Sequence, residues 1–265
     1  MNALLSGVGI LVTRPAGQSA RLAQLIRDDG GEPVLFPALA IEPLADAVPP
    51  PDPGAFDLVV FVSPNAVRLG LPQLRLRNGP SAQARLAAIG PATAAELKKS
   101  GLRNIIAPPS GNDSEALILE LSKAPPARVL IVRGRGGREL LGDTLRANGA
   151  SVEYFECYRR VRPDADMREL LAGSMRDRIK ACVATSSNIV DNLFEMAGAT
   201  ETPWLRGLPL FVSHPRIAAT AFSRGVRAVF VSGNGDDALA AGLKTWFARP
   251  RPSFQDALDS GRQKK

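Results

Sequence analysis

The sequence predicts an α/β protein built on parallel sheets, because two kinds of segment alternate along the chain. Short runs of apolar residues, typical of strands covered on both faces, are followed by stretches with helical periodicity. A second observation is an internal duplication whose period is far too long for a solenoid. Together these observations predict two related halves, each with its own sheet and covering helices.

The predicted strands are uninterrupted apolar runs, most of which become polar at their carboxyl ends. In chain order they are GILVT (9–13), DLVVFVS (57–63), RLAAIG (85–90), NIIAP (104–108), VLIV (129–132), ACVATS (181–186), LPLFVS (208–213) and AVFVS (228–232). These runs lack the strict alternation of a half-exposed sheet, so they favour strands that are buried on both faces.

The stretches between these strands repeat apolar residues at i, i+3, i+4 and i+7, as amphipathic helices do. The clearest are 19–30, 92–101, 113–123 and 138–149, and several of them end at glycine. We expect loops at 44–55, 72–83 and 161–168, and a disordered basic tail at 248–265.

The duplication relates residues 10–43 to residues 129–163. The two copies match at a constant offset of 119 positions: Arg14 with Arg133, Gly17 with Gly136, Leu22 with Leu141, Gly30 with Gly149 and Phe36 with Phe155. The segments that follow also match, with Ser63 on Ser186 and Asn65 on Asn188 at an offset of 123. Paired domains commonly hold a ligand between them, so we expect a binding site formed by both halves.

The composition narrows the class of protein. A formal net charge of +7 favours a polyanionic ligand: nucleic acid, a phosphate ester or a polycarboxylate. No apolar run approaches the 18 residues of a membrane helix, and the amino-terminal apolar run is better interpreted as a first strand than as an export signal. Two cysteines, Cys157 and Cys182, indicate no disulfide framework and suit a reducing cytoplasm.

Polar residues gather at the predicted carboxyl ends of the strands. They are Thr13, Arg14, Ser63, Arg133, Thr185, Ser186, Ser187, Ser213 and Ser232. Parallel sheets bind ligands at this edge, where helix N-termini present free amides to anions. A serine before proline, as at Ser63, is equally typical of a helix N-cap, and the two roles use the same amides.

The usual catalytic sets are mostly missing from the sequence. His214 is the only histidine, which excludes a site built from several histidines, and we expect it to be structural or solvated. The two cysteines lie on different predicted elements and indicate no zinc site. The glycine-rich turn IVRGRGGRE (131–139) has Glu139 where the third glycine of a dinucleotide fingerprint belongs, and we interpret it as an anion-binding turn rather than a simple tight turn.

Several short motifs, taken in their order, resemble one known family. They are VTRP (12–15), FPALAIEP (36–43), FVSPNAV (61–67), AIGPATA (88–94), VRG (132–134), CYRRVRP (157–163) and TSSNIVDNL (185–193). In this order they resemble the uroporphyrinogen-III synthase family over about residues 8–247. One turn departs from the family pattern: Ser213-His214-Pro215-Arg216 stands where the family usually has a threonine-bearing turn.

The resemblance implies two flavodoxin-like domains joined by a two-stranded linker, with one domain discontinuous in sequence. Residues 1–35 and 164–247 would form the first domain, and residues 44–153 the inserted second domain. Residues 36–43 and 154–163 would be the linker strands.

The resemblance also implies a reaction, the cyclisation of hydroxymethylbilane, a linear tetrapyrrole with eight carboxylates, to uroporphyrinogen III. Water is lost and the last pyrrole ring is inverted through a spiro intermediate. The substrate's own pyrrole electrons drive this chemistry, so the protein must mainly position the chain and control water. We therefore expect no cofactor and no metal, and the scarcity of histidine fits.

The matching residues give the expected site. Tyr158 in the linker strand corresponds to the family's linker tyrosine and would donate a proton or a hydrogen bond to the departing hydroxyl, or else only pack between the domains. The expected substrate-binding residues are Arg14, Ser63, Asn65, Thr93, Arg133, Thr185, Ser186 and Ser187. Arg14 and Arg133 could equally tie strand ends to neighbouring carboxylates.

We expect a cytoplasmic monomer that binds neither nucleic acid nor membrane and makes transient contact with the upstream hydroxymethylbilane synthase. The alternative is a non-catalytic two-domain binding or sensor module for an anionic ligand, which the fold alone does not separate from an enzyme. A nicotinamide-dependent enzyme is a third interpretation, weakened by the broken glycine fingerprint.

Overall fold

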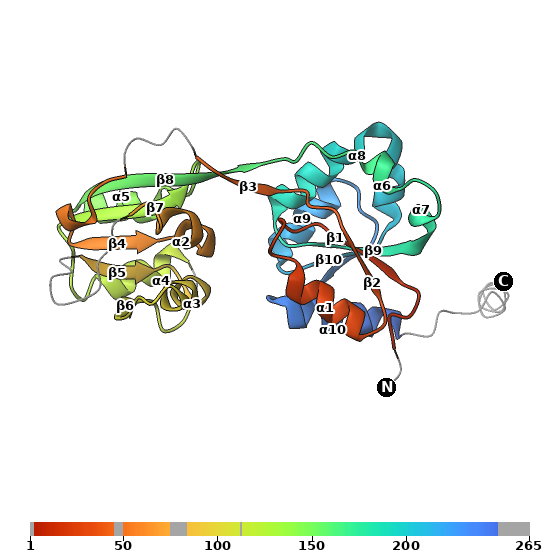
Figure 1. Cartoon of the computed structure of the whole chain (residues 1–265), viewed down its shortest axis with the longest axis horizontal. Coiled ribbons are helices and arrows are strands. Elements are labelled where there is room, and N and C mark those ends of the chain that lie inside the picture. The colour runs from red at the N-terminus through yellow and green to blue at the C-terminus, as the bar shows by residue number, and fades with distance from the viewer. Residues whose placement is uncertain (1–2, 45–49, 75–83, 112, 249–265) are drawn as a thin grey trace, which may run out of the picture. The chain divides into compact units, whose positions relative to one another are not determined.

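The computed structural model describes residues 3–44, 50–74, 84–111 and 113–248 (Figure 1). The chain divides into two compact units. Unit 1 comprises the described residues up to Ala40 and from Arg162 onward, and unit 2 comprises those within Ile41–Val161. The expected loops at 44–55 and 72–83 lie partly outside the described residues, and the expected tail at 248–265 lies outside them from residue 249.

Unit 1 contains a five-stranded sheet in which every neighbouring pair is parallel. Its strands lie in the order β11-β10-β9-β1-β2 and are β1 (Gly9–Val12), β2 (Glu32–Leu35), β9 (Ile179–Ala184), β10 (Leu210–Val212) and β11 (Val229–Val231). The central pairing joins β1 to β9, so both ends of the chain are needed to complete this sheet.

Helices cover both faces of the sheet in unit 1. They are α1 (Ala20–Asp28), α6 (Met167–Leu170), α7 (Met175–Arg178), α8 (Ser187–Gly207), α9 (Pro215–Ser223) and α10 (Asp236–Phe247). Figure 1 shows α1 beside α10, with α8 and α9 on the other side of the strands. Leu22 and Ile26 of α1 join Leu239 and Leu243 of α10 in one apolar cluster against the sheet, and each buried side chain contributes roughly 1.5–3 kcal/mol.

Unit 2 contains a six-stranded sheet in the order β3-β8-β7-β4-β5-β6. The strands are β3 (Ala40–Pro43), β4 (Leu58–Phe61), β5 (Arg85–Ala88), β6 (Ile105–Ile106), β7 (Arg128–Gly134) and β8 (Ser151–Val161), and those from β8 to β6 are parallel. The helices are η1 (Pro53–Ala55), α2 (Pro64–Gly70), α3 (Pro91–Lys99), α4 (Ser114–Leu121) and α5 (Leu140–Ala147). Residues of α2 and α3 share one core cluster, and residues of α4 and α5 share another.

The predicted α/β class with parallel sheets is confirmed. Each of the eight apolar runs overlaps a strand, and each of the four periodic stretches overlaps a helix. The linker strand expected at 154–163 overlaps the eleven-residue strand β8. The structure also contains the helix α8, which no sequence pattern predicted and which is interrupted at Gly198 by a backbone φ of 57°. The stretch 161–168, expected to be a loop, reaches into the start of α6.

The duplication has a physical counterpart in the glycine turns. Gly17 and its repeat Gly136 have φ values of 79° and 70°, and Gly30 and Gly149 have 82° and 90°. This left-handed region is open to glycine at little cost and strains other residues. The two halves therefore keep glycine at matching turns because the chain takes the same backbone path there.

A close approach of α2 to the sheet gives a first testable prediction. A Cβ at Gly70, the last residue of α2, would lie 2.5 Å from Val132 Cγ1 of β7 and 3.0 Å from Cys157 Sγ of β8. We expect Gly70→Ala to lower the free energy of unfolding by roughly 1–3 kcal/mol, measured by urea denaturation. Gly207→Ala is the matched control, because a Cβ there meets nothing within 4 Å. Equal losses in both variants would contradict this packing.

Candidate active site

Ser63 and Tyr158 come together in unit 2 although 95 positions separate them. Ser63 follows β4 and caps α2, where its Oγ accepts a hydrogen bond from the backbone N–H of Ala66 at 3.0 Å. The Tyr158 hydroxyl of β8 lies 3.0 Å from the same Oγ. The predicted N-cap is thus confirmed, and it is also half of a hydroxyl pair.

An irregularity in β8 buries Tyr158. The register between β7 and β8 shifts after the pair Arg133 and Glu156, so that Gly134 faces Tyr158. Such a bulge re-aims side chains, and the consecutive residues Cys157 and Tyr158 are both buried, at 0% and 1% exposure. A Cβ at Gly134 would lie 2.4 Å from the Tyr158 ring, so the glycine is what makes room for it.

Arg160 completes the group around Tyr158. Its NH2 lies 3.3 Å from the Tyr158 hydroxyl, and its guanidinium carbon lies 5.5 Å from the ring centroid. Arg160 was not among the expected site residues, although it stands two positions from Tyr158 on one strand, where side chains share a face. That spacing could have indicated it.

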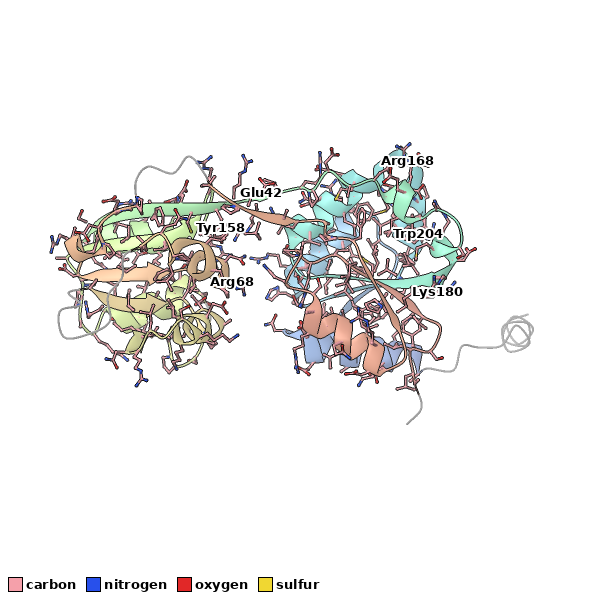
Figure 2. All side chains as sticks on the ribbon, viewed as in Figure 1. Glu42, Arg68, Tyr158, Arg168, Lys180 and Trp204 are labelled. Carbon is pink, nitrogen blue, oxygen red and sulfur yellow. The ribbon has the colours of Figure 1, made fainter. Side chains whose placement is uncertain are left out.

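The neighbouring residues of α2 and α3 have partners of their own. Arg68 donates to Asn65 Oδ1 at 3.2 Å and to Glu96 Oε1 at 2.9 Å. Figure 2 shows Arg68 and Tyr158 toward the same end of unit 2. Thr93 belongs to α3, and its side chain is buried, with only 2% exposure.

Arg133 is held by two carboxylates at the end of β7. Its guanidinium lies 2.8 Å from Glu139 and 3.1 Å from Glu156, and its carbon lies 3.8 Å from the Tyr154 ring centroid. Burial alone lowers the pKa of Arg133, but the hydrogen bonds and charges of Glu139 and Glu156 outweigh it and the pKa is raised. This is the structural role that the sequence left open for Arg133.

Arg14, the repeat of Arg133, is also paired. It forms an ion pair with Asp236 at the start of α10, and both side chains are largely buried. The repeat therefore preserves an arginine at the end of an inner strand, while the carboxylates that neutralise it come from unrelated positions.

Three hydroxyl residues follow β9 in unit 1. Ser186 caps α8, where its Oγ accepts from the N–H of Ile189 at 3.2 Å. Ser187 Oγ accepts a hydrogen bond from Thr220 of α9 at 2.9 Å, and Thr185 is half-buried beside them. Thr220 was not predicted, because only the packing of α9 against α8 brings it here.

The remaining reactive residue types have structural roles. His214 caps α9, with its Nδ1 accepting from the N–H of Arg216 at 3.1 Å, which confirms the expected structural role. Burial raises the pKa of Cys157 to about 12 and also raises that of Cys182, so both thiols stay protonated. Within the described residues, no three His, Cys, Asp or Glu side chains are arranged to hold a metal ion. No helix in that part of the chain is long and apolar enough to cross a bilayer.

Comparison with known proteins gives the family. Residues 20–239 match the model of the family described as uroporphyrinogen-III synthase HemD. The chain belongs to the uroporphyrinogen-III synthase family. The uroporphyrinogen-III synthase of Escherichia coli is 32% identical over 249 residues, which cover 89% of this chain and 100% of the relative. That of Salmonella typhimurium is 33% identical with the same coverage.

Solved structures of the family share the fold. The Helicobacter pylori enzyme matches with a TM-score of 0.58 at 15% identity, covering 90% of this chain and 99% of its own. A mutant of the Thermus thermophilus synthase matches with a TM-score of 0.55 at 22% identity, covering 96% and 99%.

The carboxylates around Arg133 make the stability of this family member depend on pH. The pKa of Glu139 lies below its ordinary value of 4.5, first because of a hydrogen bond from Tyr154 and then because of one from Arg133. A depressed folded-state pKa means that ionised Glu139 stabilises the fold above its unfolded-state pKa, and that this contribution disappears as the pH falls through the folded value.

We expect Glu139→Gln to lower the urea midpoint at neutral pH. The difference from wild type should shrink as the pH falls below the ordinary glutamate value of 4.5. Glu153→Gln, at an exposed position of β8, should leave the midpoint unchanged. A loss that stays constant from pH 7 to pH 3 would show that the charge of Glu139 is not its cause.

Proposed function

We propose that this protein is a uroporphyrinogen-III synthase, a lyase that cyclises hydroxymethylbilane to uroporphyrinogen III with loss of water and inversion of the last pyrrole ring. The observation that carries the proposal is the match to the Escherichia coli synthase over that protein's full length. The chemistry fits the residues present, since the substrate supplies the electrons and the protein supplies positioning and control of water.

The substrate's carboxylates require hydrogen-bond donors. We assign this role to side chains that remain partly accessible: Asn65, Thr185, Ser186 and Ser187. Ser63 is also partly accessible, and we assign it a contact with the substrate at the departing hydroxyl. Hydrogen bonds to charged oxygens are stronger than those between neutral groups, so a few hydroxyls suffice to orient a polycarboxylate.

Arg14, Arg133 and Thr93 have a supporting role. Both arginines already neutralise carboxylates, and Thr93 is buried within α3. We assign them the task of holding the strand ends and the first turn of α3 in place, with any direct contact to substrate made by Arg14, which keeps 14% side-chain exposure.

The proposed enzyme acts as a cytoplasmic monomer and receives its substrate by transient contact with the enzyme that makes hydroxymethylbilane. The instability of that substrate supports such a transfer, because unguided ring closure in water gives the uninverted isomer. The proposed reaction uses neither a metal nor an organic cofactor.

The decisive experiment separates isomer III from isomer I. Hydroxymethylbilane is generated in place, the purified protein is added, and the products are separated by chromatography after oxidation. We expect isomer III to predominate without added metal or nucleotide, and to persist with a chelator. Isomer I alone, at the rate of the blank, would favour the non-catalytic binding module. Loss of activity with the chelator would refute the cofactor-free mechanism.

Tyr158 is the proposed source of assistance to the departing hydroxyl. Tyr158→Phe keeps the ring that fills the space over Gly134 and removes the hydroxyl. We expect kcat to fall roughly 10- to 100-fold, while the free energy of unfolding falls by only about 1 kcal/mol for the lost hydrogen bonds. Turnover equal to that of wild type would reduce Tyr158 to a packing residue.

A further inference from the structure

Arg160, Tyr158 and Ser63 form a hydrogen-bonded series. A guanidinium can only donate, so Arg160 donates to the Tyr158 hydroxyl oxygen across 3.3 Å. Ser63 Oγ lies 3.0 Å from the same hydroxyl, and either of these two groups could donate to the other. If Ser63 donated, the proton of the buried phenol would have no acceptor among the hydrogen bonds of the described residues, so we take the order as Arg160 to Tyr158 to Ser63.

Ser63 is the last member of this hydrogen-bonded series, and its own hydroxyl proton remains available for donation. Its oxygen has two acceptor positions, and the N–H of Ala66 and the Tyr158 hydroxyl fill them. The hydrogen bonds of the described residues include no acceptor for the Ser63 hydroxyl proton itself. Capping of α2 accounts for the bond from Ala66 and leaves the one from Tyr158 unexplained.

Exposure decides which hydroxyl can meet a ligand. Tyr158 is 1% exposed and belongs to the core cluster of unit 2, whereas Ser63 is half-buried. A buried phenol cannot reach the substrate directly, but it can act through the serine.

We propose that Ser63 is the catalytic proton donor of the synthase, that Tyr158 resupplies it, and that Arg160 positions Tyr158. The proposal rests on the proposed function. The pyrrole electron pair breaks the C–O bond, and the leaving oxygen takes the Ser63 proton and departs as water. Ser63 takes the proton of Tyr158, and the resulting phenolate faces the guanidinium of Arg160. The proton that the substrate releases on closing its ring returns through Ser63 to Tyr158.

The proposal predicts that Ser63 and Tyr158 act as one unit. Ser63→Ala should lower kcat for isomer III at least as much as Tyr158→Phe, by roughly 10- to 100-fold. The double variant should be no slower than Ser63→Ala, because groups that act in series are non-additive. Ser63→Thr keeps both the hydroxyl and the cap and should retain most of the activity.

A matched control removes the contribution of capping. Asp113 caps α4 of the same unit and accepts from the N–H of Ala116 at 3.0 Å. Asp113→Ala should lower the urea midpoint, as Ser63→Ala does through the loss of its cap, and keep wild-type turnover.

Separate measurement of kcat and KM tests the positioning role of Arg160. Its side chain is exposed and its charge is screened, so Arg160→Met should lower kcat only about threefold to tenfold, with KM unchanged. Arg160→Lys, which keeps a charged donor, should restore most of the rate. A change confined to KM would make Arg160 a substrate contact and overturn its positioning role.

The outcomes separate the relay from the function. If the wild type makes isomer III and the rate losses of the two single variants multiply in the double variant, the proton transfer from Tyr158 through Ser63 is wrong but the synthase function holds. The same conclusion follows if Ser63→Ala has the turnover of Asp113→Ala. Isomer I alone from wild type would overturn both.

Discussion

The pairing of β7 with β8 is the constraint on which the candidate site depends. The shift in register after Arg133 places Gly134 opposite Tyr158, and the missing side chain of that glycine leaves room for the ring. The phenol then reaches past β7 to Ser63, which follows β4. A regular strand would have sent Cys157 and Tyr158 to opposite faces, and the hydroxyl pair would not exist.

Much of the fold could be predicted from the sequence, because it has strong local patterns. These patterns are the apolar runs of parallel strands covered on both faces and the glycines at which helices end. The N-cap at Ser63 was readable for the same reason, as a serine before proline. The contact between Ser63 and Tyr158 could not be predicted from the sequence, because it spans 95 positions and depends on a bulge that no local pattern indicates. The partner of Arg14 could not be predicted either, since Asp236 is 222 positions away in the sequence.

The two halves of the internal duplication share backbone geometry but differ in the hydrogen-bond partners of their side chains. Matching glycines turn the chain in the same left-handed way, and Ser63 and Ser186 cap corresponding helices. Their second partners differ, however: Ser63 meets a phenol, while the hydroxyls after β9 are tied to Thr220 through Ser187. The two halves therefore share a backbone scaffold and carry different side-chain networks on it.

The pairing of β1 with β9 also sets the order in which the protein can fold on the ribosome. Unit 2 is complete once Val161 has been made, and its core needs nothing that follows. Unit 1 has by then only β1, α1 and β2, and the apolar faces of these elements must wait for Ala181, Val183 and the helix α10. The earliest residues of the nascent chain are therefore among the last to be buried. Their apolar surface stays exposed during this interval, which makes the amino-terminal segment the part of the nascent chain most prone to non-native contacts.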